Sequence, residues 1–65
     1  MKVGENVVAR RKITEWEFTE AGQEHVHAEV GDLGEVVHVG ELITVQWKRT
    51  GTAATVVASE IEAAP

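Results

Sequence analysis

The sequence predicts an all-β fold, a small barrel of about five short antiparallel strands. Three observations predict it. Apolar and polar residues alternate at period two in several segments, as they do in a strand with one buried face and one solvated face. Glycines stand between these segments, where tight turns are required. No segment carries a sustained helical period.

The N-terminal part predicts one strand followed by an irregular segment. Lys2-Val3-Gly4-Glu5 is typical of a turn, and the chain from Asn6 to about Lys12 is expected to be extended. Thr14–Glu24 is the least regular stretch and holds Trp16 and Phe18 among acidic and amide side chains. We expect a long loop there that lays one or both aromatic rings on the barrel mouth. A short amphipathic helix is the alternative.

The next elements are a strand and a tight turn. Val26, Ala28 and Val30 alternate with polar residues, which indicates a half-buried strand. The glycines of Gly31-Asp32-Leu33-Gly34 permit positive φ, and an aspartate side chain bonds nearby backbone. We therefore expect this stretch to turn the chain into the following strand.

A meander of three antiparallel strands is expected next. The clearest alternation lies in its middle strand, where Ile43, Val45 and Trp47 share one face. In the strand before it, Val37 and Val39 are assigned to the core and Val36 to the opposite face. The expected strands and turns are Glu35–Val39, Gly40–Glu41, Leu42–Lys48, Arg49–Thr52 and Ala54–Ala58.

The C-terminal part predicts a single 3₁₀ turn at Ser59–Glu62 that places Ile61 in the core, followed by a frayed tail at Ala63–Pro65. Residues 1–62 are expected to form one domain. The predicted core consists of Val7, Val26, Val30, Leu33, Val37, Val39, Ile43, Val45, Trp47, Val57 and Ile61.

This order of features resembles the SH3-like small barrels of the electron-transport-accessory type. The resemblance is carried by the opening Val3-Gly4-Glu5-x-Val7-Val8, by Gly31-Asp32-x-Gly34-x-Val36, and by the closing Ser59-Glu60-Ile61. Similar chains include the photosystem I small stromal subunit, the ferredoxin–thioredoxin reductase variable chain, the nitrile hydratase beta chain and NifZ-type proteins. Because those chains mostly dock or assist other proteins, the resemblance implies a docking or accessory role and carries over no catalytic motif.

Length and charge further narrow the classes of protein to which this chain can belong. A chain of 65 residues without cysteine has neither disulfides nor thiolate metal sites, and its small core makes stability marginal. Its composition predicts a soluble, cytoplasmic protein with no membrane partner. The formal net charge of -5 disfavours nucleic-acid binding, which needs basic side chains against phosphates. A local basic patch is the weaker alternative, formed by Arg10, Arg11, Lys12, Lys48 and Arg49.

The pattern His25-x-His27-x-Glu29 is the candidate metal site. On a regular strand these side chains point the same way, roughly 6.5–7 Å apart, and His38 on a neighbouring strand is a further candidate. Imidazole and carboxylate are zinc ligands. A solvated polar face is the favoured interpretation, because histidine pairs on exposed strands need no metal. If the metal hypothesis holds, added zinc raises the melting temperature.

The preferred function is a non-catalytic interaction or accessory domain without a cofactor. No nucleophile–base pair or phosphate-binding loop has a supporting context. The expected docking residues lie in the irregular segment, whose acidic side chains favour a partner with a basic surface. They are Glu15, Trp16, Glu17, Phe18 and Glu20. We expect a monomer or a weak strand-exchanged dimer that uses Thr14–Glu24 as a hinge.

Overall fold

The computed structural model describes residues 1–17 and 22–65, with the side chains of Trp16 and Glu17 outside the description. The described residues form seven strands and one 3₁₀ turn, so the expected all-β fold class is confirmed. All pairings are antiparallel. The elements are β1 (Asn6–Ala9), β2 (Ile13–Glu17), β3 (Gln23–Ala28), β4 (Leu33–Val39), β5 (Ile43–Trp47), β6 (Ala53–Val56), the 3₁₀ turn η1 (Ala58–Glu60) and β7 (Ile61–Ala63).

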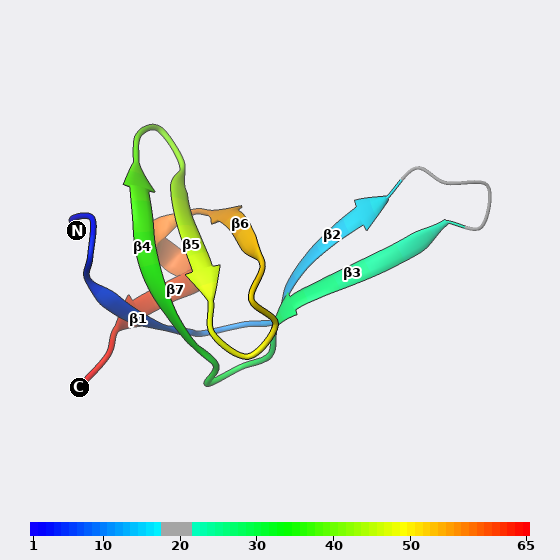
Figure 1. The fold of residues 1–65 in the computed structure, drawn as a ribbon, viewed down its shortest axis with the longest axis horizontal. Coiled ribbons are helices and arrows are strands. Elements are labelled where there is room, and N and C mark those ends of the chain that lie inside the picture. Colours follow the sequence, from blue (N-terminus) through cyan, green and yellow to red (C-terminus); the bar gives the residue numbers. More distant parts are fainter. Residues whose placement is uncertain (18–21) are drawn as a thin grey trace.

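The strands divide into two regions, which we call the body and the hairpin. The body is a five-stranded sheet in the order β6-β5-β4-β1-β7, and the hairpin is the pair β2-β3. Figure 1 shows the body curling on itself while the hairpin extends away from it on one side, along the longest dimension of 39 Å. The hydrogen-bonded order ends at β6 and β7, so the sheet is not closed. The fold is compatible with an SH3-like barrel.

The core lies on the concave face of the body and at the base of the hairpin. Alternation on β5 buries Ile43, Val45 and Trp47 as expected, and Trp47 is the largest fully buried side chain among those described. The expected burial of Val7 and Ile61 is also confirmed. Among the residues whose side chains are described, the buried apolar ones are Val7, Ala9, Ile13, Ala28, Val36, Ile43, Val45, Trp47, Ala54, Val56 and Ile61.

A bulge in β4 overturns part of the predicted core. Val36 pairs with Val45, but His38 pairs with Thr44, so Val37 is an extra residue in β4. Val36 pairs with the buried Val45 and is itself fully buried, whereas the extra residue Val37 is 39% exposed. Val39 pairs with Ile43 at the end of β4 and is 43% exposed.

Four further positions of the predicted core are not buried. Val30 lies in the turn after the hairpin, where no strand covers it, and is 68% exposed. Leu33, at the start of β4, is 38% exposed. Val57 follows β6 and is 46% exposed, because its neighbour Val56 takes the inward position. Val26 is half-buried.

The two glycines of the Gly31–Gly34 turn serve different purposes. Gly31 has φ = +89°, as expected for the turn. Gly34 does not have a positive φ and lies inside β4 instead. A Cβ at Gly34 would stand 2.5 Å from Val45 Cγ1 and 2.8 Å from Trp47 Cε3. This glycine is required because two fully buried side chains pack against its backbone.

For the described residues of Thr14–Glu24, both the expected long loop and its helical alternative are wrong, and residues 18–21 lie outside the description. β2 and β3 pair directly, with Trp16 opposite Glu24 and Glu17 opposite Gln23. The sequence pattern does not reveal these strands, because acidic side chains occupy positions on both of their faces.

No helix in the described part of the chain combines the length and hydropathy needed to cross a lipid bilayer.

The C-terminal segment is held by β1. The 3₁₀ turn η1 precedes Ile61, which is only 3% exposed, so the expected placement of this side chain in the core is confirmed. Ala63 belongs to the segment expected to fray, but it lies in β7 and pairs with Val7 of β1. The Ala64 N–H donates to the Asn6 carbonyl at 2.9 Å. Backbone pairing therefore continues as far as Ala64.

Candidate functional site

The candidate site is the hairpin together with its attachment to the body, and the attachment begins at Asp32. The Asp32 carboxylate accepts the Glu29 N–H at 2.9 Å and Arg49 Nε at 2.7 Å. The Asp32 N–H donates in turn to the Glu29 carbonyl at 3.0 Å. The Glu29 N–H first, and then Arg49, hold the pKa of Asp32 below its usual value. Asp32 thus connects the end of the hairpin to the β5–β6 turn.

His27 makes the second attachment. Its Nδ1 lies 2.7 Å from Thr52 Oγ1, and its carbonyl accepts the Thr50 hydroxyl at 2.9 Å. Both threonines belong to the β5–β6 connection, and their hydroxyl oxygens are 2.9 Å apart. The β5–β6 turn therefore binds the hairpin through both the side chain and the backbone of one residue.

A bulge in β3 explains why His27 faces inward. Thr14 pairs with Val26, but Ile13 pairs with Ala28, so His27 is an extra residue in β3. It is 8% exposed, and the expected solvated position is wrong for this side chain. The physical reason is the bulge, which breaks the alternation and buries His27 beside Ala28.

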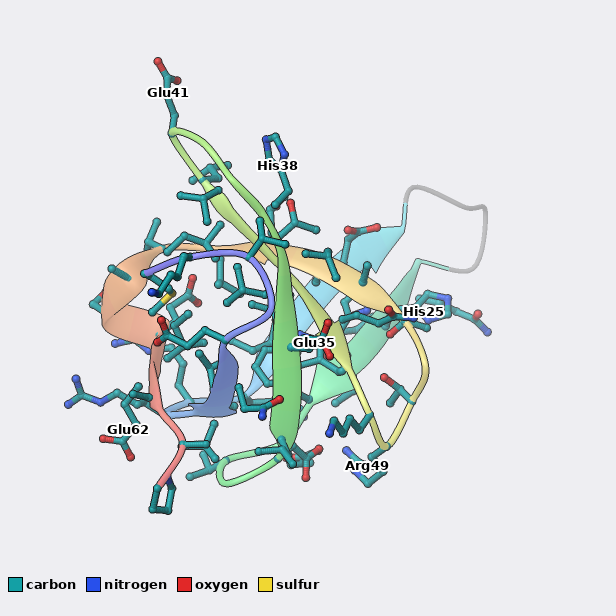
Figure 2. The ribbon with its side chains drawn as sticks, turned by 60° about the vertical axis from the view of Figure 1, so that its left-hand side comes forward. His25, Glu35, His38, Glu41, Arg49 and Glu62 are labelled. Carbon is teal, nitrogen blue, oxygen red and sulfur yellow. The ribbon has the colours of Figure 1, made fainter. Side chains whose placement is uncertain are left out.

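The three candidate metal ligands of the histidine pattern are not brought together in the described part of the chain. The His25 and His27 rings stack with centroids 6.4 Å apart, but Glu29 lies beyond the end of β3. The carboxylate near His27 is instead Glu15 of β2, with Oε2 at 3.9 Å from Nε2. Figure 2 shows His38 near the turn between β4 and β5, well separated from His25. Within residues 1–17 and 22–65, no three His, Asp or Glu side chains could hold a metal ion together.

The expected docking residues fall partly within the description. Glu15 lies in β2 opposite His25, and its side chain is 65% exposed. Trp16 and Glu17 have defined positions in the strand, but their side chains lie outside the described set. Phe18 and Glu20 lie outside the described residues altogether. The hairpin register places Glu15, Glu17 and Glu24 on neighbouring positions of two paired strands.

An open pocket lies on the body at β4, β5 and the β5–β6 turn. It encloses about 240 Å³ and is lined by Glu35, Gln46, Trp47, Lys48 and Gly51. A single carboxylate and a single ammonium group at an open depression do not make an acid–base pair with a nucleophile. The basic residue Arg49 is already bonded to Asp32.

Sequence reasoning missed the residues that attach the hairpin. The sequence predicts only a turn at Thr50 and Thr52. The available signal was the pair of threonines flanking Gly51, since hydroxyl groups beside a turn often bond nearby backbone. The long-range partner of these hydroxyls, 25 residues away for Thr52, has no local signal in the sequence.

Comparisons with family models, with curated proteins and with solved structures found no match to this chain.

Proposed function

We propose that this protein is a non-catalytic interaction module that docks on another protein through its β2–β3 hairpin. The observation that carries the proposal is the projection of the hairpin from the body (Figure 1). A projecting two-stranded ribbon exposes two strand edges and both faces to a partner, whereas it buries little apolar surface within its own chain. The resemblance to accessory chains of the electron-transport type supports the same role.

The charge of the hairpin defines the partner surface. Glu15, Glu17 and Glu24 belong to its paired strands, and Glu20 lies between the strands in the sequence. Opposite charges across an interface accelerate encounter and lose effect as salt rises. The partner therefore presents a basic patch, and association slows with increasing ionic strength.

Trp16 is the proposed anchor of the contact. Its position in β2 is paired with Glu24 of β3, so the residue lies on the ribbon itself and not on the body. Buried tryptophans supply a large share of the binding energy at protein interfaces, while surrounding polar residues exclude water. Trp16 thus provides affinity, and the acidic residues provide orientation and speed.

The test compares charge changes of equal size at the two ends of the molecule. Glu17→Lys with Glu24→Lys changes the hairpin. Glu41→Lys with Glu62→Lys is the matched control, because both residues are exposed and point away from the hairpin (Figure 2). Proteins recovered from native lysate are quantified for the parent, for each double variant and for Trp16→Ala. Far-ultraviolet circular dichroism checks that every variant is folded.

The expected result is a partner that the parent and the control variant retain and that both hairpin variants lose. The recovered partner is then titrated with the purified parent at several salt concentrations, and its association rate falls as salt rises. Equal recovery by all folded variants contradicts docking through the hairpin, and so does loss of the partner in the Glu41/Glu62 control alone.

A further inference from the structure

We propose that His27 and Glu15 form a proton-dependent latch at the base of the hairpin. Neutral His27 carries its proton on Nδ1, and a second proton taken from solvent at Nε2 creates a hydrogen bond to the Glu15 carboxylate. The proposal is independent of docking and stands on the arrangement of four side chains from β2, β3 and the β5–β6 connection.

Counting protons assigns the tautomer of His27. The Thr50 hydroxyl has one hydrogen, and it donates that hydrogen to the His27 carbonyl, which can only accept. The Thr50–Thr52 hydrogen bond must therefore use the hydrogen of Thr52. Thr52 Oγ1 then has only acceptor capacity left for the ring. Because Nδ1 lies 2.7 Å from that oxygen, Nδ1 must carry the proton.

The other ring nitrogen is then a bare acceptor. Nε2 of His27 is buried and has no hydrogen-bond partner among the described residues. Glu15 Oε2 lies 3.9 Å from Nε2 and is also an acceptor. Two facing acceptors make no hydrogen bond, and a buried unsatisfied polar atom is unfavourable. The arrangement lacks one proton.

Protonation at Nε2 resolves both defects. The imidazolium donates from Nδ1 to Thr52 and from Nε2 to Glu15, so each ring nitrogen has an acceptor. The Glu15 side chain is 65% exposed and can move the short distance needed for a charge-assisted bond. The added bond joins β2 to β3 at the residue that already bonds the β5–β6 turn, so the protonated ring connects both strands of the hairpin to the body.

The neighbouring ionisable groups affect the latch unequally. Glu15 of β2 favours the charged ring. His25 of β3 stacks on it at 6.4 Å, so a charge on His25 opposes a second charge on His27. Arg49 of the β5–β6 turn is engaged by Asp32, and Lys48 lines the pocket by Glu35 and Gln46. β6 contributes no ionisable side chain, since it reads Ala-Ala-Thr-Val.

The sign of the pH effect follows from where the proton binds. The proposed bond from Nε2 to Glu15 exists only when the second proton is on the ring, so its contribution to stability belongs to the acidic end of the pH range. Glu15→Gln should therefore lower the melting temperature by a few degrees at about pH 5 and have little effect at about pH 8. Glu24→Gln, on the same hairpin, is the matched control, and its effect on the melting temperature should be the same at the acidic and alkaline ends of the pH range.

Nitrogen-15 NMR of the His27 ring tests the tautomer directly. At the alkaline end the Nδ1 signal should be that of a protonated nitrogen and Nε2 that of a bare one, and Thr52→Val should weaken this preference. A neutral ring protonated at Nε2 overturns the proposal. A Glu15→Gln effect that is the same at both ends of the pH range also overturns it, as does an equal pH-dependent effect of Glu24→Gln.

Discussion

The body and the hairpin are built from similar alternating strands, yet the alternation has different consequences in each. In the body, neighbouring strands cover the inward positions, so Val7, Val36 and Val45 are completely buried. In the hairpin, only the base is covered, where Ile13 and Ala28 join the core. Toward its tip the described side chains of β3 are exposed. Alternation therefore supplies stability only where a second layer faces it, and the hairpin is left to present its side chains.

The largest expected effect contrasts two valines in the body. Val45→Ala removes methyl groups from a fully buried site and should cost about 2–4 kcal/mol by lost burial and the resulting cavity. Val37→Ala makes the same chemical change at the bulge, where the side chain is 39% exposed, and should stay within about 0.5 kcal/mol of the parent. Urea unfolding followed by tryptophan fluorescence measures both. Similar losses of unfolding free energy in the two variants would show that Val37 is buried as deeply as Val45 and that β4 has no bulge at Val37.

Gly34→Ala should have the next largest effect, because an added methyl group meets the core directly. The new Cβ would stand 2.5 Å from Val45 and 2.8 Å from Trp47, and neither buried side chain has space to retreat. Overpacking of this kind costs about 1–3 kcal/mol.

Gly40→Ala is the matched control for Gly34→Ala. Its nearest contact is the exposed His38 ring at 3.2 Å, which can rotate away, so the loss should be under about 0.5 kcal/mol. Thermal unfolding by circular dichroism compares the two variants. A Gly34→Ala protein as stable as the control would mean that β4 does not pack closely on Trp47.

The sequence predicted the body better than the hairpin, for identifiable reasons. Strict alternation at Ile43, Val45 and Trp47 has only one consistent inward face, and that face is correct. The adjacent valine pairs Val36-Val37 and Val56-Val57 offer two equivalent choices, and a bulge or a strand end decides between them. Bulges depend on how two strands pair, so a single strand's pattern does not contain them.

The candidate site was predictable in position but not in its contacts. The sequence pointed to the segment around Trp16 and to the histidines that follow it, and the structure places both on the hairpin. The ribbon itself was missed because acidic side chains weaken the strand signal. The pairing of His27 with Glu15 and Thr52 requires a bulge and a distant turn, and neither has a local signature.

The smallest expected effect concerns Asp32, which joins the two regions. Its carboxylate accepts from Glu29 at the end of the hairpin and from Arg49 of the body, and the pKa of Asp32 is lowered as a result. A lowered pKa means that the folded state holds this proton less tightly than the unfolded chain. Its stabilising contribution is therefore present above the unfolded value of about 3.9 and is lost as pH falls through the lower folded value.

Asp32→Asn should reduce stability slightly at neutral pH and converge with the parent below about pH 3, because the parent carboxyl is then increasingly protonated. The asparagine oxygen can still accept the Glu29 N–H, but it has no charge for Arg49. The loss should shrink with added salt, since Arg49 is exposed and exposed ion pairs are screened. Melting temperatures of both proteins across this acid range test the sign. A gap that widens toward acid would show that Asp32 is more stabilising when protonated, and the hairpin would then join the body by hydrogen bonding without charge.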